Sequence, residues 1–184
     1  MTNQAVRNFL FVSTVMGFAS GSTLPGLAFA QDSKKATPEF LMERMTGKWV
    51  MRGTIANEKV THDVHVDRIL NRQYVRIHEV SREKDASGKP AYEAWIHIAW
   101  DKANKEFVVM WLDNTGVTNF SPDGVGHGKP AGDRIPFIWK LADGSGIHNT
   151  FAYDRTSDAW SWKIDNLEKS GKSSPFGRVT LKRK

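Results

Sequence analysis

Two histidines and two charged residues form the first group in this sequence whose types and spacing could do chemistry. A tight turn at residues 71–72 sets His65 opposite His78 and Asp67 opposite Arg76 on adjacent strands. Two imidazoles beside a carboxylate suit Zn²⁺ or acid–base catalysis. The other face of this hairpin is mainly valine and isoleucine, the pattern of a core. We therefore favour an outer, solvated face with an ion pair between Asp67 and Arg76, and we expect no bound metal.

His97 is the second candidate for acid–base work, because Trp95, Trp111 and Asp113 belong to the same predicted hairpin. A histidine facing the interior would serve as a proton-transfer group. A half-buried strand histidine bonded to a neighbour is the interpretation we favour. Two registers fit this hairpin, and they differ in which face His97 and Trp111 share. The chain has no cysteine and no nucleophile elbow, which argues against nucleophilic hydrolase chemistry.

The stretch 134–167 carries the densest set of aromatic residues. Turn signals at 142–146 and 154–159 divide it into three alternating runs, the pattern of an antiparallel meander. The tightest registers set Leu141 opposite Ile147 and Tyr153 opposite Trp160. One face then forms an aromatic wall, and Leu141 belongs to it. The candidate ligand-binding residues of this wall are Phe137, Trp139, Asn149, Phe151, Tyr153, Trp160 and Trp162, with Trp111 from the neighbouring hairpin. This wall is either packed core or a stacking surface for a ligand.

The length and composition of the chain predict one soluble domain. The chain has 184 residues, and seven tryptophans require a large apolar interior, an interface or a ligand pocket. The net charge of +6 is carried partly by basic residues at the chain ends. No motif for DNA or RNA binding accompanies it, so we expect a solvated surface and no nucleic-acid partner.

Residues 1–30 have the pattern of a signal peptide. Arg7 precedes an apolar segment broken by glycine and proline, and Ala28-Phe29-Ala30 fits the cleavage rule. The sequence therefore predicts an exported protein, periplasmic or secreted, that starts at Gln31 and has no stable membrane insertion after cleavage. Residues 31–36 are polar and predicted to be flexible.

The remaining residues, 37–184, predict one all-β domain behind a short helix. Thr37 is the expected N-cap, Pro38 the first helical residue and Gly47 the stop, so the helix would act as a lid or plug. We expect ten antiparallel strands in an up-and-down barrel. Their predicted ranges are 47–54, 59–69, 72–82, 92–100, 105–113, 117–121, 134–141, 147–154, 159–167 and 177–183. Residues 122–133, rich in glycine and proline, are predicted to form a loop over one mouth of the barrel.

Several segments resemble known barrels. LMERMTGKWVMRGT resembles the opening of lipocalin-like (calycin) barrels, where a short helix leads into a G-x-W strand. DRILNRQYV and AWDKANKEFVVMWLDNTG resemble a bacterial set called Domain of Unknown Function 1579. The resemblance implies a calycin-type barrel that holds a ligand. It also implies that Trp49 lies at the closed end with Arg178 or Arg183 packed on it, a cation–π contact that closes the sheet.

Haem-binding nitrobindin-type barrels share the G-x-W opening and ligate iron through a histidine near the C-terminus. This chain has no histidine after His148, so we expect no haem or other cofactor.

Three functions follow from these features. The first is an exported barrel, monomeric or weakly self-associating, that binds a small apolar or aromatic molecule in its lumen. The second is a lyase, isomerase or hydrolase that uses His97, or the group of His65, His78 and Arg76. The third is an interaction scaffold with a filled lumen.

Overall fold

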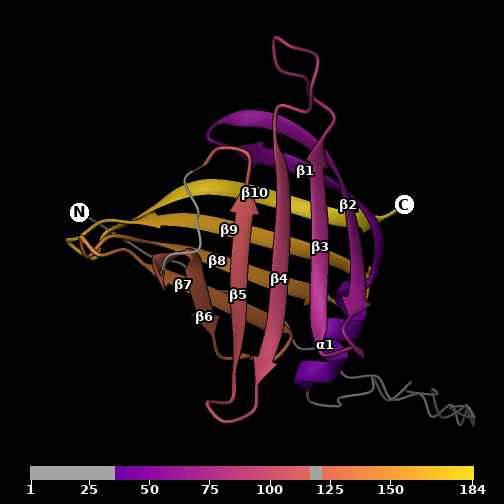
Figure 1. Ribbon diagram of the computed structural model, residues 1–184, viewed down its shortest axis with the longest axis vertical. Coiled ribbons are helices and arrows are strands. Elements are labelled where there is room, and N and C mark those ends of the chain that lie inside the picture. Colours follow the sequence, from indigo (N-terminus) through magenta and orange to yellow (C-terminus); the bar gives the residue numbers. More distant parts are fainter. Residues whose placement is uncertain (1–35, 117–121) are drawn as a thin grey trace, which may run out of the picture. The chain divides into compact units, whose positions relative to one another are not determined.

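The protein is described here by a computed structural model, which places residues 36–116 and 122–184. These residues form a closed barrel of ten antiparallel strands in the order β1-β10-β9-β8-β7-β6-β5-β4-β3-β2, with one short helix (Figure 1). The predicted all-β, ten-stranded, up-and-down barrel is therefore confirmed. The predicted signal peptide, nearly all of the segment 31–36 and the predicted strand 117–121 lie outside the described residues.

The strand boundaries follow the predicted ranges closely, with two exceptions at β6 and β10. In chain order the elements are α1 (Pro38–Met45), β1 (Gly47–Ile55), β2 (Glu58–Ile69), β3 (Tyr74–Ser81), β4 (Glu93–Asp101), β5 (Glu106–Asp113), the 3₁₀ turn η1 (Pro122–Gly124), β6 (Val125–Gly128), β7 (Arg134–Lys140), β8 (Gly146–Asp154), β9 (Ala159–Leu167) and β10 (Ser173–Arg183). β10 begins four residues earlier than predicted, because a bulge between Pro175 and Gly177 lets it continue pairing with β9.

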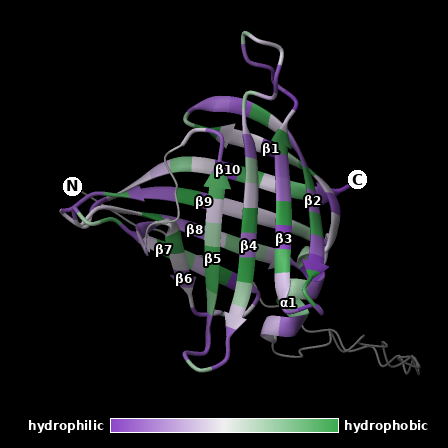
Figure 2. Ribbon diagram, in the orientation of Figure 1, coloured by the Kyte–Doolittle hydropathy of each residue, from purple (hydrophilic) through white to green (hydrophobic). Residues whose placement is uncertain are grey.

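Alternating hydropathy decides which side chains fill the barrel. Apolar and polar residues alternate along most strands (Figure 2), as a sheet with one buried face requires. In β7, for example, Ile135, Phe137 and Trp139 are buried and point inward, while their neighbours point outward. The tight turn at 71–72 fixes β2 against β3 as predicted, with His65 opposite His78 and Asp67 opposite Arg76.

β6 corrects the prediction that residues 122–133 form a loop. Val125–Gly128 pairs with β5 and, through His127 and Ile138, with β7. A Cβ atom on Gly126 would lie 2.5 Å from the Trp139 ring. Glycine at this position thus makes room for the large Trp139 side chain, which points inward. Glycine is also the residue typical of loops, so the sequence alone does not distinguish a glycine needed for close packing from a loop glycine.

The hairpin of β7 and β8 corrects a second prediction. Trp139, rather than Leu141, lies opposite Ile147. The turn is shorter than expected, because the Leu141 N–H donates to the Ser145 carbonyl and Gly144 has φ +87°. Leu141 is 40% exposed and belongs to this turn rather than to the aromatic wall. A register change of two residues leaves every other side chain on its predicted face.

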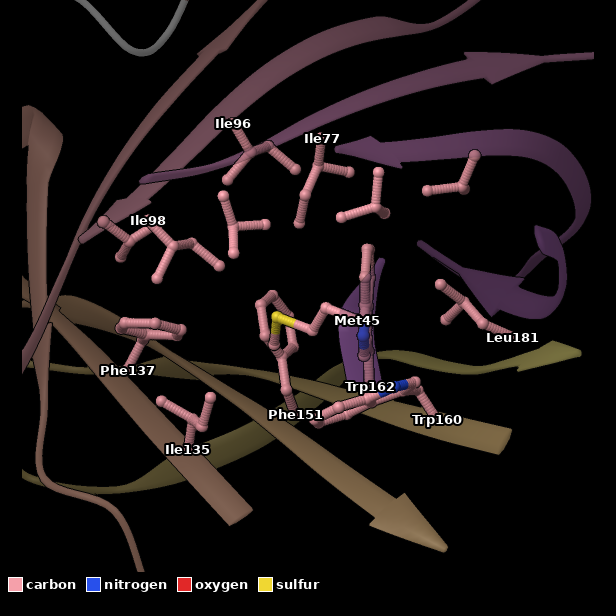
Figure 3. Packing of buried hydrophobic residues seen from close by; sticks show 14 of the residues in the cluster. Met45, Ile77, Ile96, Ile98, Ile135, Phe137, Phe151, Trp160, Trp162 and Leu181 are labelled. Atoms are coloured by element: carbon pink, nitrogen blue, oxygen red, sulfur yellow. The ribbon is translucent and has the colours of Figure 1, made fainter. Parts of the chain in front are cut away.

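The helix α1 plugs one end of the barrel. Thr37 caps it by accepting a hydrogen bond from the Phe40 N–H at 3.1 Å, and Leu41, Met42 and Met45 are buried. Figure 3 shows Met45 among aromatic and aliphatic side chains that converge from several strands. The connection between β3 and β4 projects beyond the other end (Figure 1). We call the end covered by α1 the helix end, and the opposite one, where β3 ends and β4 begins, the distal end.

Two indoles and a guanidinium bind the last carbonyls of α1. Trp49 Nε1 donates to the Met45 carbonyl at 2.8 Å, and Trp160 Nε1 donates to that of Arg44 at 3.2 Å. Arg183 donates to the Thr46 carbonyl at 2.8 Å, and its Cζ lies 4.0 Å from the centroid of Trp49. Of the two arginines that the resemblance implied, Arg183 thus lies over Trp49.

Arg178 instead bonds to the Ile164 carbonyl at 2.8 Å and pairs with Asp165 on the surface of the barrel. Of these two arginines, Arg183 is therefore the one that joins the first strand, the last strand and the helix.

No helix among the described residues is long and apolar enough to cross a membrane.

The contacts of Arg183 predict its contribution to stability. Arg183→Ala removes the cation–π contact, the bond to the Thr46 carbonyl and the ion pair with Asp158, so we expect a loss of about 1–3 kcal/mol in urea unfolding. Arg178→Ala, a surface arginine of the same strand, should cost less than about 1 kcal/mol. Equal losses in the two variants would contradict this assignment.

Candidate functional site

The four residues proposed for catalysis lie on the outer face of the barrel. His65 is exposed, and His78 bonds through Nε2 to Glu93 at 2.7 Å. The His78 ring also stacks on Trp95, with centroids 3.9 Å apart. Arg76 donates to both carboxylate oxygens of Asp67, at 3.1 and 2.7 Å. His65, His78 and Arg76 therefore point away from the lumen, and His78 and Arg76 are engaged in contacts on the surface.

His97 and Trp111 point to opposite faces of the sheet. In the observed register Trp111 pairs with buried Ile96 and faces inward, whereas His97 pairs with Arg76 and Met110 and faces outward. Partial burial lowers the pKa of His97, and the positive charge of Arg76 lowers it further. This histidine is therefore neutral at pH 7 and does not line the lumen.

Within residues 36–116 and 122–184, no three histidine, aspartate or glutamate side chains gather closely enough to hold a metal ion.

The aromatic wall faces inward. Its members come from β5, β7, β8 and β9, and Trp111 alone among them is half-buried while the others are buried. Phe151 stacks on Trp162 with centroids 4.4 Å apart, and Phe137 meets Phe151 edge to face at 5.4 Å. Figure 3 shows Phe137, Phe151 and Trp162 on one side of this interior. These rings contact one another directly, so the middle of the lumen is packed core.

The burial of inward side chains decreases toward the distal end. At the helix end Leu41, Trp49 and Trp160 are buried. At the distal end the inward apolar side chains are only partly buried and pack on the rim of the core; they are Ile55, Val60, Tyr92, Trp111 and Ile147. Most of the partly buried apolar side chains that pack on the core are therefore at the distal end, while Phe40 and Trp100 are partly buried beside α1.

Tyr92, Trp111 and Asp113 form a hydrogen-bonded chain on this surface. Trp111 Nε1 donates to the Tyr92 hydroxyl at 2.9 Å, and that hydroxyl donates to Asp113 Oδ2 at 3.3 Å. Burial raises the pKa of Tyr92, and the negative charges of Glu79 and Asp113 raise it further. The phenol therefore stays neutral and holds the Trp111 ring in place.

A buried histidine–glutamate pair lies beside this chain. His62 Nδ1 is 2.5 Å from Glu79 Oε1, and the imidazole stacks on Tyr92 with ring centroids 5.6 Å apart. Both side chains are nearly inaccessible, at 4% and 2% exposure. The second carboxylate oxygen, Glu79 Oε2, is buried and has no hydrogen-bond partner among the described residues.

Asn149 is the polar member of the aromatic wall. It is buried between Phe137 on β7 and Ile164 on β9, and its Oδ1 accepts no hydrogen bond from any described residue. A buried amide oxygen without a donor carries a desolvation cost that a ligand N–H or O–H, or a water molecule, would remove.

Sequence reasoning missed the pair of His62 and Glu79. The predicted register already set Glu79 on the face of Ile77 and opposite Val64, so an acid stood on an apolar face. Such an acid needs a partner, and His62 is its diagonal neighbour across the two strands. Continuing the alternation from Val64 back to residue 62 would have found it.

Two surface hollows lie outside the lumen. One, of about 620 Å³, covers the outer sides of β5, β6 and β7 and includes Val125, His127 and Ile138. The other, of about 590 Å³, lies where α1 meets Arg68 and Trp100. Neither hollow contains the histidine–glutamate pair or the aromatic wall.

Comparison with known proteins supports the fold alone. No model of a protein family matches the chain, and no curated protein matches its sequence. Among solved structures, the crystal structure of Rv2717c from M. tuberculosis is similar, with a TM-score of 0.53 and 12% identity. The match covers 80% of this chain and 98% of that one. At this sequence identity, the structural similarity supports the barrel architecture and does not assign an activity.

The packing of the wall predicts the effect of truncating it. Trp162 is 3% exposed, stacks on Phe151 and meets Trp111 edge to face at 6.4 Å. Trp162→Ala should therefore lower the free energy of unfolding by about 3–5 kcal/mol, measured by urea denaturation. Trp95→Ala, which removes a tryptophan 38% exposed on the outer face, should cost about 1 kcal/mol or less. A small loss in the first variant would mean that the wall borders open space.

Proposed function

We propose that this protein binds a small, largely apolar or aromatic molecule at the distal end of its lumen. One observation carries the proposal: Trp111 faces inward, is half-buried, and is held by the Tyr92 hydroxyl above the closed aromatic core. A tryptophan fixed at the border of the accessible surface offers a ring on which a flat molecule can stack. The other aromatic residues of the wall lie deeper in the barrel and form the floor beneath Trp111 rather than the contact surface.

Two further features support a ligand with a polar group. Mostly apolar sites with a few placed polar atoms are typical of small-molecule binding. Glu79 Oε2 and Asn149 Oδ1 are buried acceptors without partners among the described residues, and both belong to inward-facing side chains. A molecule with an apolar ring and a hydrogen-bond donor would complement this end of the barrel.

The proposal is tested with an uncharged fluorescent probe, N-phenyl-1-naphthylamine, whose emission rises in apolar surroundings. We expect the wild-type protein to bind it and Trp111→Ala to weaken binding at least about fivefold, because stacking on one ring contributes about 1 kcal/mol.

The matched control is Trp95→Ala, which removes the same side chain from the outer face of the neighbouring strand and should leave binding unchanged. Near-UV circular dichroism checks that both variants keep the native packing. Absence of binding by the wild type would contradict the proposal and favour the scaffold alternative.

We also propose that the protein is exported. The support is the segment 1–30, in which a charged start, an apolar stretch and Ala28-Phe29-Ala30 follow the order of a signal peptide. N-terminal sequencing of protein recovered from the periplasm or medium should give Gln31 as the first residue. Recovery from the cytoplasm with Met1 or Thr2 at the N-terminus would contradict export.

A further inference from the structure

The strongest unassigned feature is the acid–base pair of His62 and Glu79. It lies on the inner face at the distal end, on the same lumen surface as Trp111 and Tyr92. The partners of His78 on the outer face, Glu93 and Trp95, do not contact this pair. Burying an imidazole and a carboxylate costs free energy unless they pair closely, and the 2.5 Å separation meets that condition.

Glu79 determines which nitrogen of His62 is available to a ligand. Its Oε1 bonds to His62 Nδ1, and its Oε2 has no partner among the described residues, so the imidazole is the only described group that donates to this carboxylate. In the neutral imidazole the carboxylate therefore favours the tautomer with the proton on Nδ1 and the lone pair on Nε2. No described residue hydrogen-bonds to Nε2.

The neighbouring groups do not compete for that nitrogen. The buried or half-buried titratable side chains on the inner face at this end, within the described residues, are His62, Glu79, Tyr92 and Asp113. The Tyr92 hydroxyl accepts from Trp111 and donates to Asp113, so it is occupied. The Tyr92 ring, tilted by 20° from the imidazole, instead fixes the plane in which Nε2 lies.

We propose that His62 Nε2 accepts the proton of a weakly acidic O–H or N–H group on the ligand, with Glu79 as the positioning residue. This rests on the proposed function, because the ligand must lie at the distal end. The ligand O–H or N–H bond breaks, an N–H bond forms on Nε2, and the electron pair stays on the ligand. The imidazolium is stabilised by Glu79, as in carboxylate–histidine pairs in general. The ligand class is thus phenols and ring compounds with an acidic N–H.

Two probes of the same shape separate this inference from simple binding. 4-Nitrophenol carries an acidic O–H, and its phenolate absorbs at longer wavelength than the phenol. 4-Nitroanisole has the same ring and a methyl group in place of the acidic hydrogen. We expect the protein to bind both, to bind 4-nitrophenol about tenfold more tightly, and to raise its phenolate fraction above that of free probe at the same pH.

Two variants assign the effect. Glu79→Gln keeps the shape but removes the charge, so the phenolate signal should fall at least about fivefold while 4-nitroanisole binding stays within twofold. The double variant His62→Phe/Glu79→Leu keeps a ring against Tyr92 and leaves no unpaired charge, so it should fold and bind both probes equally, with no phenolate signal.

The outcomes distinguish two failures. Binding of 4-nitroanisole without any phenolate gain from 4-nitrophenol would overturn the inference and leave the proposed function standing. A phenolate gain that persists in the double variant would also overturn it, since another base would then be responsible. Binding of neither probe by the wild type would overturn the proposed function itself.

Discussion

The carbonyl groups at the C-terminal end of α1 are the constraint on which the rest of this barrel depends. The last carbonyls of a helix have no partners within it, and here they lie where α1 covers one end of the barrel. The indoles of Trp49 and Trp160 and the guanidinium of Arg183 supply the missing donors. Since these donors come from the first, ninth and tenth strands, satisfying the helix also fixes where the sheet closes.

This arrangement divides the interior into two parts with different physical character. Near α1, buried indoles serve as hydrogen-bond donors and as packing volume. Toward the distal end, Glu79 Oε2 and Asn149 Oδ1 are buried acceptors that have no hydrogen-bond partner among the described residues. In most protein cores, buried polar groups are either paired by hydrogen bonds or avoided. Buried polar groups without a partner are concentrated at functional sites.

The sequence predicted faces better than it predicted partners. Side chains alternate between the two faces of a strand with a period of two residues, so a register change of two residues leaves each one on the same face. Phe137, Trp139 and Trp162 are therefore on the predicted inner face, although the predicted pairing of Leu141 was wrong. β6 could not be predicted, because Gly126 and Gly128 carry no hydropathy signal and their purpose lies in the shape of Trp139 and the backbone of β7. The spacing of His65, His78 and His97 on neighbouring strands predicted catalytic candidates that lie on the outer face. The buried pair was missed because His62 and Glu79 are polar residues on a face that reads as apolar.

The contact between Arg183 and Thr46 has a consequence for how the chain reaches its structure. These residues are 137 positions apart, and the pairing of β1 with β10 spans a similar separation. Neighbouring strands pair locally, but each such pair leaves an open edge until the two ends of the domain meet. The hairpins that form first shorten the loop that remains to be closed, but the pairing of β1 with β10 still requires both ends of the domain, and such non-local contacts favour slow folding. During synthesis the partly assembled sheet has exposed edges. Pairing of the final strand, β10, with β1 closes the barrel and makes its folding cooperative.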